Sequence, residues 1–354
     1  MHMADALLSP AVGGTFWAVT AGTAAYCARK LRGLPAGNGS PLMGVLGAFL
    51  FAAQMINFSI PGTGSSGHLG GGLLLTILLG PYAAFLTVSS VLIVQALFFA
   101  DGGLLALGCN IFNMAFLPAF VAYPLIYRPI AGDRPGAKRL SVACVVAAVV
   151  ALQLGAFAVV VETLASGISA LPFATFVLFM LPIHLAIGLV EGFVTAAIVG
   201  LVGRARPDLL DQGTAISASA GRSATRLIGV LFCAALVTGG LLSWFASEDP
   251  DGLEWSIARV AGEQALDAPA GGLHGLLAGI QQRLAVFPDY GFAKEEDGRA
   301  SGEAGRSAED PSRARIGSSV SGIVGALVTL VLVVLIGVLL RWWTRPARAP
   351  GEQR

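Results

Sequence analysis

The stretch Leu140-Ser-Val-Ala-Cys-Val-Val-Ala-Ala-Val-Val-Ala-Leu-Gln-Leu-Gly-Ala-Phe-Ala-Val-Val-Val161 decides the fold class of this chain. It contains no charged side chain, and about 20 apolar residues are enough to cross the hydrocarbon core of a bilayer as a helix. In lipid, the backbone can satisfy its own hydrogen bonds in a helix. The stretch therefore predicts a membrane span.

The composition of the whole chain agrees with that prediction. Of its 354 residues, 55% are hydrophobic and only 12% are charged, whereas soluble domains average about 25% charged residues. The 46 glycines are typical of membrane helices that pack through small residues. A net charge of +1 gives no electrostatic footprint for a nucleic-acid partner. We expect an all-α integral membrane protein in contact with the lipid bilayer.

Other apolar runs along the chain predict a polytopic bundle of about 7 to 9 transmembrane helices. The third run is short and is separated from the fourth by Gly80-Pro81, which is compatible with either a tight turn or a broken helix. The nine candidate spans are Ser9 to Ala28, Pro41 to Phe58, Leu69 to Leu79, Tyr82 to Ala100, Cys109 to Ile126, Leu140 to Val161, Phe173 to Val202, Ser223 to Ala246 and Ser319 to Leu340.

The basic residues predict the orientation. Fifteen of the 22 Lys and Arg residues follow the first, fifth, seventh and last spans, all on one side of the membrane, and the other seven lie in the acidic segment 247–318. By the positive-inside rule, the amino terminus is extracytoplasmic and the carboxyl terminus is cytoplasmic. We expect a multi-pass protein of the cell membrane.

The chain divides into regions of different composition. Residues 1–205 form the main membrane region, 206–222 a cytoplasmic linker, 223–342 a two-span module and 343–354 a cytoplasmic tail. Within the module, 247–318 is an extracytoplasmic segment that begins with a small helical part, and its polar stretch 294–316 reads as a flexible tether. We expect this module to be separable, and Trp255, Phe287 and Tyr290 to contact the loop that precedes the third span.

Two of the four histidines, His2 and His68, are predicted on the same outer face. Met1 should be retained, because no basic region and no small-residue cleavage site follow it. The Met1 amine, the His2 amide nitrogen and the His2 imidazole can chelate one ion, and His68 can supply a fourth nitrogen. Four nitrogens in a plane suit Ni²⁺ or Cu²⁺, followed by Co²⁺. The alternative is two chance histidines near a terminus and in a loop.

Other polar residues are candidates for supporting roles. Asp5, Asn57, Ser66 and Asp101 lie near the outer face and could hold the imidazoles in place. His184 and Glu191 are seven residues apart, so they share one helix face as a possible coupling or structural pair. The alternative for each intramembrane polar residue is ordinary hydrogen bonding between helices. A membrane enzyme that uses His184 and Glu191, or a membrane metal sensor, is the rival function.

Nucleotide chemistry is not supported. The stretch Gly62-Thr-Gly-Ser-Ser-Gly67 begins like a phosphate loop, but His68-Leu69 replaces the Lys-Ser/Thr that a phosphate loop requires. We expect its glycines to allow a sharp turn.

Several ordered motifs resemble one family. Met1-His-Met-Ala-Asp-Ala-Leu-Leu-Ser-Pro10 is similar to the start of the cobalt and nickel substrate-binding membrane subunits (CbiM/NikM) of energy-coupling-factor transporters. Further blocks with this resemblance are Phe51 to Phe58, Ser66 to Leu69, Gln95 to Gly103, Leu107 to Met114 and Glu191 to Thr195. Pro250-Asp-Gly-Leu-Glu254 resembles the PDGLE module that is often fused behind such subunits as the NikN/CbiN-like component.

This resemblance implies a transport subunit and not an enzyme. It implies that Co²⁺ or Ni²⁺ is held by Met1, His2 and His68 and is carried inward for cobalamin synthesis or for nickel enzymes. It also implies two cytoplasmic ATP-binding subunits and a transmembrane coupling subunit as partners, and no prosthetic group. In the resembling family, the metal-binding subunit is expected to topple in the bilayer.

Overall fold

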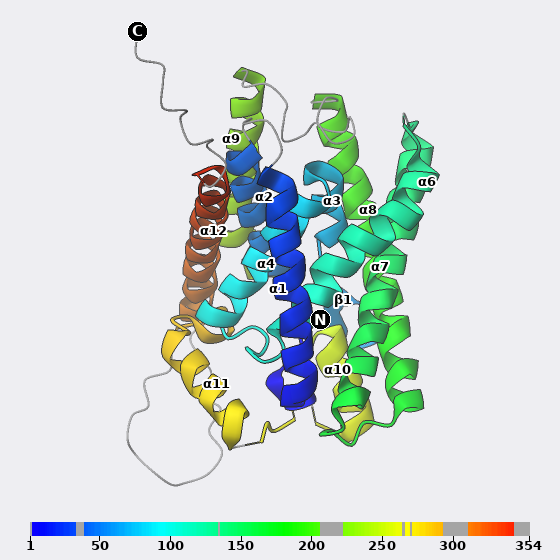
Figure 1. The fold of residues 1–354 in the computed structure, drawn as a ribbon, viewed down its shortest axis with the longest axis vertical. Coiled ribbons are helices and arrows are strands. Elements are labelled where there is room, and N and C mark those ends of the chain that lie inside the picture. Colours follow the sequence, from blue (N-terminus) through cyan, green and yellow to red (C-terminus); the bar gives the residue numbers. More distant parts are fainter. Residues whose placement is uncertain are drawn as a thin grey trace, which may run out of the picture.

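The structure is a computed structural model that describes residues 2–32, 39–133, 135–205, 222–263, 266–269, 271–292 and 311–342. Figure 1 shows long helices that run side by side, with their axes roughly along the long dimension of the molecule. The main helices are α1 (Pro10–Arg32), α2 (Gly39–Gln54), α3 (Gly72–Leu79), α4 (Pro81–Phe98), α5 (Leu107–Ile111), the π-helix η2 (Phe112–Tyr127), α6 (Arg128–Ala131), α7 (Ala137–Ser166), α8 (Phe173–Ala205), α9 (Arg222–Gly240), α10 (Gly252–Ala261), α11 (Gly272–Leu284) and α12 (Pro311–Trp342).

The helices confirm the predicted fold class. Each of the nine predicted spans overlaps a helix, and five helical segments in the described part of the chain are long and apolar enough to cross a membrane. Two shorter apolar helices, Ser40–Gln54 and Arg226–Gly240, accompany them. The chain is thus a multi-pass helical membrane protein.

Short elements complete the fold outside the long helices. The 3₁₀ segments are η1 (Asp5–Leu7), η4 (Leu242–Phe245) and η5 (Pro288–Tyr290). Strands β1 (Phe58–Ile60) and β2 (Ser65–Gly67) form an antiparallel hairpin with Ser59 opposite Ser66. This hairpin occupies residues that the sequence assigned in part to the second span, since α2 ends at Gln54.

The break at Gly80 separates α3 from α4. Gly80 has a φ of 78°, which favours glycine, and Pro81 begins the next helix. The eight residues of α3 rise by about 12 Å, which is too short to cross a bilayer. The structure therefore has a broken helix, one of the two arrangements that the sequence allowed.

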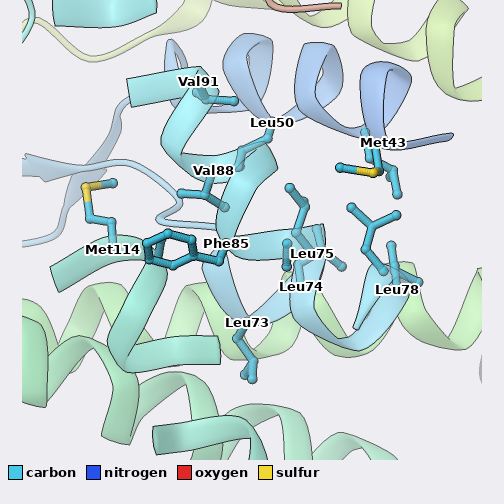
Figure 2. Close-up of a cluster of buried hydrophobic side chains, with 14 of the residues drawn as sticks. Met43, Leu50, Leu73, Leu74, Leu75, Leu78, Phe85, Val88, Val91 and Met114 are labelled. Atoms are coloured by element: carbon cyan, nitrogen blue, oxygen red, sulfur yellow. The ribbon is translucent and has the colours of Figure 1, made fainter. Parts of the chain in front are cut away.

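Helix α3 lies at the centre of the apolar core. Figure 2 shows Leu73, Leu74, Leu75 and Leu78 of α3 surrounded by side chains of α2, α4 and η2. All eight residues of α3 are buried. The residues that precede α3, which include His68, are therefore attached to a helix that is buried on all sides.

The two long helices of the module pack against each other and against the first region through glycines. A Cβ on Gly322 of α12 would lie 2.3 Å from the main-chain oxygen of Gly239 on α9, and a Cβ on Gly325 would lie 2.0 Å from the Phe51 ring of α2. Glycines allow such close approach of helices, which is how membrane helices gain van der Waals contact. The module is thus built into the bundle.

The outer segment contains the predicted helical part. Helices α10 and α11 lie toward one end of the molecule in Figure 1, and Asp251 and Glu254 form a capping box at the start of α10. Helix α12 begins at Pro311, so residues 311–316, predicted as part of the tether, are helical. Residues 293–310, residues 206–221 of the predicted linker 206–222 and the tail 343–354 lie outside the described residues.

Within the described residues, the basic ends of α1 and α8 are separated from the outer segment, as the sequence predicted. The basic last turns of α1 and α8 lie at the end of the molecule opposite α10 and α11 in Figure 1. Which of these two ends faces the cytoplasm stays a prediction.

Candidate metal-binding site

The amino-terminal segment is threaded into the bundle and held by its backbone. The Asn110 side chain accepts a hydrogen bond from Met3 N (2.8 Å) and donates one to Met3 O (3.2 Å). Gly103 N donates to the same oxygen at 2.9 Å. These three bonds fix the residue that follows His2. Met1 itself lies outside the described residues.

His68 directly follows the β1–β2 hairpin. Gly62 and Gly64 have φ values of 77° and 70°, so the glycines do provide the predicted sharp turn. His68 Nδ1 lies 3.2 Å from Leu69 O, and a carbonyl oxygen can only accept, so Nδ1 carries the hydrogen. The Nε2 atom of the neutral ring therefore holds the lone pair that a metal ion needs.

The structure brings the two candidate imidazoles together. The rings of His2 and His68 are stacked, with centroids 5.1 Å apart and planes 17° from parallel. Burial lowers the pKa of His2 to about 3 and that of His68 to about 3, so both rings are neutral at neutral pH. Two neutral imidazoles from distant segments form a pair of nitrogen donors.

Of the four residues proposed to support the imidazoles, Asp101 contacts one of them. Its Oδ1 lies 3.2 Å from His2 Nδ1, and its Oδ2 accepts a hydrogen bond from the hydroxyl of Tyr290. The ring of Tyr290 stacks on Phe99 at 5.0 Å. The outer segment thus holds the aspartate that touches His2.

The other three candidates have partners away from the imidazoles. Asp5 Oδ1 accepts from Ala106 N at 3.0 Å, near the start of α5. The main-chain oxygen of Asn57 accepts from Ser247 N at 2.8 Å. Ser66 Oγ donates to Asp249 O at 2.7 Å.

His184 and Glu191 both lie in α8 but make different hydrogen bonds. Glu191 accepts hydrogen bonds from Gly70 N (2.7 Å) and Gly71 N (3.0 Å), just after His68. His184 Nδ1 lies 2.8 Å from Met180 O on its own helix. Glu191 therefore holds the loop that carries His68.

A small cavity lies beside His68. It has a volume of about 20 Å³, which is enough for about one water molecule. Its lining includes four side chains that can bind protons or metal ions, namely His68, His184, Glu191 and Asp251.

Sequence reasoning missed how directly the PDGLE turn covers the hairpin. Ser66 N donates to Pro250 O at 2.8 Å, and Ser66 forms a parallel bridge with Asp251. Trp255 Nε1 donates to Thr63 O at 3.0 Å, which confirms the expected contact of Trp255 with this loop. Phe287 N donates instead to Phe98 O, at the last residue of α4, and the Tyr290 hydroxyl donates to Asp101 rather than to this loop.

Two buried residues were also not given their roles. Asn110, in the fifth predicted span, was given no role of its own, whereas its side chain makes two hydrogen bonds to the backbone of Met3. Glu162 is buried in α7 and accepts a hydrogen bond from Asn113 Nδ2 at 2.9 Å, although the predicted span ends one residue earlier, at Val161. The signal that the sequence offered was the position of Glu162 directly after the uncharged run Leu140 to Val161.

Side chains alone do not make a complete metal cage here. Among the described residues, no group of three or more His, Cys, Asp or Glu residues is arranged to hold a metal ion. A site at His2 and His68 needs other donors, and backbone nitrogens are the donors that the sequence suggested.

The comparisons with known proteins cover both parts of the chain. Residues 2–209 match the family CbiM, described as the cobalt uptake substrate-specific transmembrane region, and residues 225–342 match the PDGLE domain.

Two of the relatives with known names are named as fused proteins. The fused nickel transport protein NikMN of Rhodobacter capsulatus is 31% identical over 313 residues, 82% of this chain and 88% of the relative. The putative fused nickel transport protein NikMN of Archaeoglobus fulgidus is 39% identical over 219 residues, 61% of this chain and 70% of the relative. The cobalt transport protein CbiM of Geobacter sulfurreducens is 31% identical over 256 residues, 68% of this chain and 72% of the relative.

Solved structures agree in fold. A crystal structure of a transition metal transporter is 28% identical, with a TM-score of 0.52, and the match covers 60% of this chain and 98% of that one. Because the relatives are named as metal transport proteins, a transporter subunit is supported over an enzyme. The chain belongs to the CbiM family of cobalt uptake membrane proteins, with a PDGLE domain fused behind the family region.

Proposed function

We propose that the chain is the substrate-specificity subunit of an energy-coupling-factor importer that captures Co²⁺ or Ni²⁺ outside the cell. The observation that carries the proposal is the stacked pair of neutral imidazoles of His2 and His68. The hairpin and the threaded amino-terminal segment hold these rings from both sides. The metal ion is the cargo of the site.

The ligand set follows from chelate geometry. The amine of Met1 and the amide nitrogen of His2 close a five-membered ring with the ion. The same amide and Nδ1 of His2 close a six-membered ring, whereas Nε2 points away from the backbone. His68 Nε2 completes four nitrogens, a set that suits Ni²⁺ and accepts Co²⁺.

Transport requires partners that supply energy. We propose two cytoplasmic ATP-binding subunits and a transmembrane coupling subunit, with the metal-binding subunit toppling in the bilayer to carry its loaded site inward. The separation of basic helix ends from α10 and α11 supports an extracytoplasmic site. The imported ion then serves cobalamin synthesis or nickel enzymes.

The proposed role of the module is to load the site or to ease opening of the loop before His68. Its PDGLE turn and Trp255 hold the hairpin, while Tyr290 holds Asp101. Opening the hairpin therefore involves separating it from residues 250–255.

An extension before Met1 tests the proposal. A few added residues convert the amine into an amide, so Ni²⁺ binding by the purified protein should be abolished although the protein still inserts in the membrane. The same extension after Arg354 is the control and should leave the affinity unchanged. Normal affinity with the amino-terminal extension would refute the ligand set.

A further inference from the structure

Gln95 lies at the end of α4, fully buried, and takes part in a hydrogen-bonded chain of side-chain amides. Gln54 Nε2 donates to Gly70 O at 2.9 Å, and Gln95 Nε2 donates to Gln54 Oε1 at 2.9 Å. Because Gly70 O can only accept, it fixes which end of Gln54 faces Gly70, and Gln54 then fixes Gln95 in turn. The Oε1 atom of Gln95 is therefore the end that remains for another partner.

Two buried atoms at this point lack a hydrogen-bond partner within the described part of the chain. They are Oε1 of Gln95 and Nε2 of His2. The Gln95 side chain and the His2 imidazole are close enough to interact. Buried polar atoms are nearly always paired, so an unpaired couple of neighbours calls for a functional explanation.

The tautomer of His2 explains why these two atoms are unpaired. His2 Nδ1 faces the carboxylate of Asp101 at 3.2 Å and so carries the ring hydrogen in this structure. Nε2 then holds a lone pair, and Gln95 Oε1 can only accept. Both atoms are then acceptors, and neither has a donor among the described residues.

We propose that Gln95 is the positioning residue that selects the metal-binding tautomer of His2, by accepting a hydrogen bond from Nε2 once the ion occupies Nδ1. This inference rests on the proposed function, since it concerns the same site. The ring stays neutral: Nδ1 gives up its proton, Nε2 gains one, and the exchange releases no net proton. Metal binding thereby breaks the contact with Asp101 and pairs both unpaired atoms.

The same chain of amides joins the two metal-ligand segments. It runs from His2 through Gln95 and Gln54 to Gly70, two residues after His68. Glu191 holds Gly70 from the other side. A metal-ligating histidine ordinarily donates its second ring hydrogen to such a partner, and loss of that partner costs about 10- to 100-fold in metal affinity.

The test compares three variants with the intact wild-type chain. Gln95→Met keeps the size of the side chain but removes the acceptor, and it should weaken Ni²⁺ affinity about 10- to 100-fold. Gln95→Glu, whose protonated carboxyl keeps one donor for Gln54 Oε1 and one acceptor oxygen, should bind within a few-fold of wild type. Gln153→Met is the matched control, because Gln153 is also a membrane glutamine, bonded to Leu181 O away from the site; its affinity should not change.

Spectroscopy separates positioning from general stability. With Cu²⁺ as the probe, electron paramagnetic resonance should report one nitrogen fewer for Gln95→Met and a wild-type signal for Gln95→Glu and Gln153→Met. A Gln95→Met variant with wild-type affinity and spectrum overturns the inference, as does a Gln95→Glu variant as weak as Gln95→Met. If wild type binds Ni²⁺ equally well with an extended amino terminus, the proposed function fails, whatever these variants do.

Discussion

Trp255 Nε1 donates a hydrogen bond of 3.0 Å to the main-chain oxygen of Thr63, at the turn of the hairpin that leads to His68. Ser66 and Ser59 of the same hairpin bond to Asp249 O and Ser247 Oγ. The hairpin is thus held along its length by the start of the outer segment. Changes in that segment should therefore alter the rate of metal exchange more than they alter the ligand set.

Removal of residues 221–354 should slow metal uptake by cells while leaving Ni²⁺ retention by the purified first 220 residues largely intact. The reason is that the proposed donors lie on residues 1, 2 and 68, all outside the deleted part. Uptake assays in cells and dialysis of the loaded protein check this. A truncated protein that binds no metal would place the module inside the site.

Trp255→Phe should loosen the hairpin without removing a ligand. It deletes one hydrogen bond worth about 1 kcal/mol, so the open hairpin should become about five-fold more populated. Rates of Ni²⁺ association and hydrogen exchange at residues 61–67 measure this. Trp244→Phe is the matched control, since Trp244 Nε1 bonds to Ser319 Oγ away from the hairpin; equal rates for both variants would contradict the prediction.

His68→Gln should weaken Ni²⁺ binding strongly, because an amide is a poor substitute for an imidazole ligand. His274→Gln is the comparison: His274 Nε2 lies 2.8 Å from Leu8 O, and an amide can keep that hydrogen bond. Isothermal titration of both variants checks the difference. Similar losses in the two would argue for diffuse surface binding.

Asn110→Ala should destabilise the threaded segment by about 2 kcal/mol, because it removes two hydrogen bonds and leaves Met3 N buried without its partner. Metal affinity should fall with it, since Met3 fixes His2. Asn110→Asp keeps the acceptor for Met3 N and should lose less. Denaturant unfolding in detergent, together with Ni²⁺ titration, compares the three proteins.

The metal-free protein should lose stability in mild acid. The pKa of His68 is lowered by burial from 6.5 to about 3, so between these values the unfolded chain binds a proton that the folded chain does not. By pH 7.5 the effect has almost vanished, and at pH 5.5 it amounts to about 1.4 kcal/mol for this residue. Thermal unfolding measured at pH 7.5 and pH 5.5 should show the loss, and His68→Gln should show less of it.

The sequence predicted the membrane fold because hydropathy is a local property. Runs such as Leu140 to Val161 coincide with helices, and the break at Gly80-Pro81 occurs where glycine and proline stand together. Counting spans predicted only that His2 and His68 lie on the same face, since an even number of crossings separates two loops on one face; the stacking of their rings is seen in the structure.

The contacts that hold the site were much harder to predict. The bonds of Asn110 to Met3 and of Ser66 to Asp249 join residues 107 and 183 positions apart, so no local periodicity signals them. The partner of Asp5 was not predicted either, because its carboxylate accepts a hydrogen bond from the backbone of Ala106 and not from an imidazole. Glu162 was misplaced because the helix α7 runs to Ser166, beyond the uncharged run that marked the span.

The bond between Trp255 and Thr63 also has a consequence for biosynthesis. A ribosome adds about 5 to 20 residues per second, so roughly 10 to 40 s pass between the emergence of Thr63 and that of Trp255, 192 residues later. During that interval the hairpin exists without the segment that covers it. The nascent protein therefore passes through a stage in which its outer loop is open, and synthesis of the last third of the chain closes it.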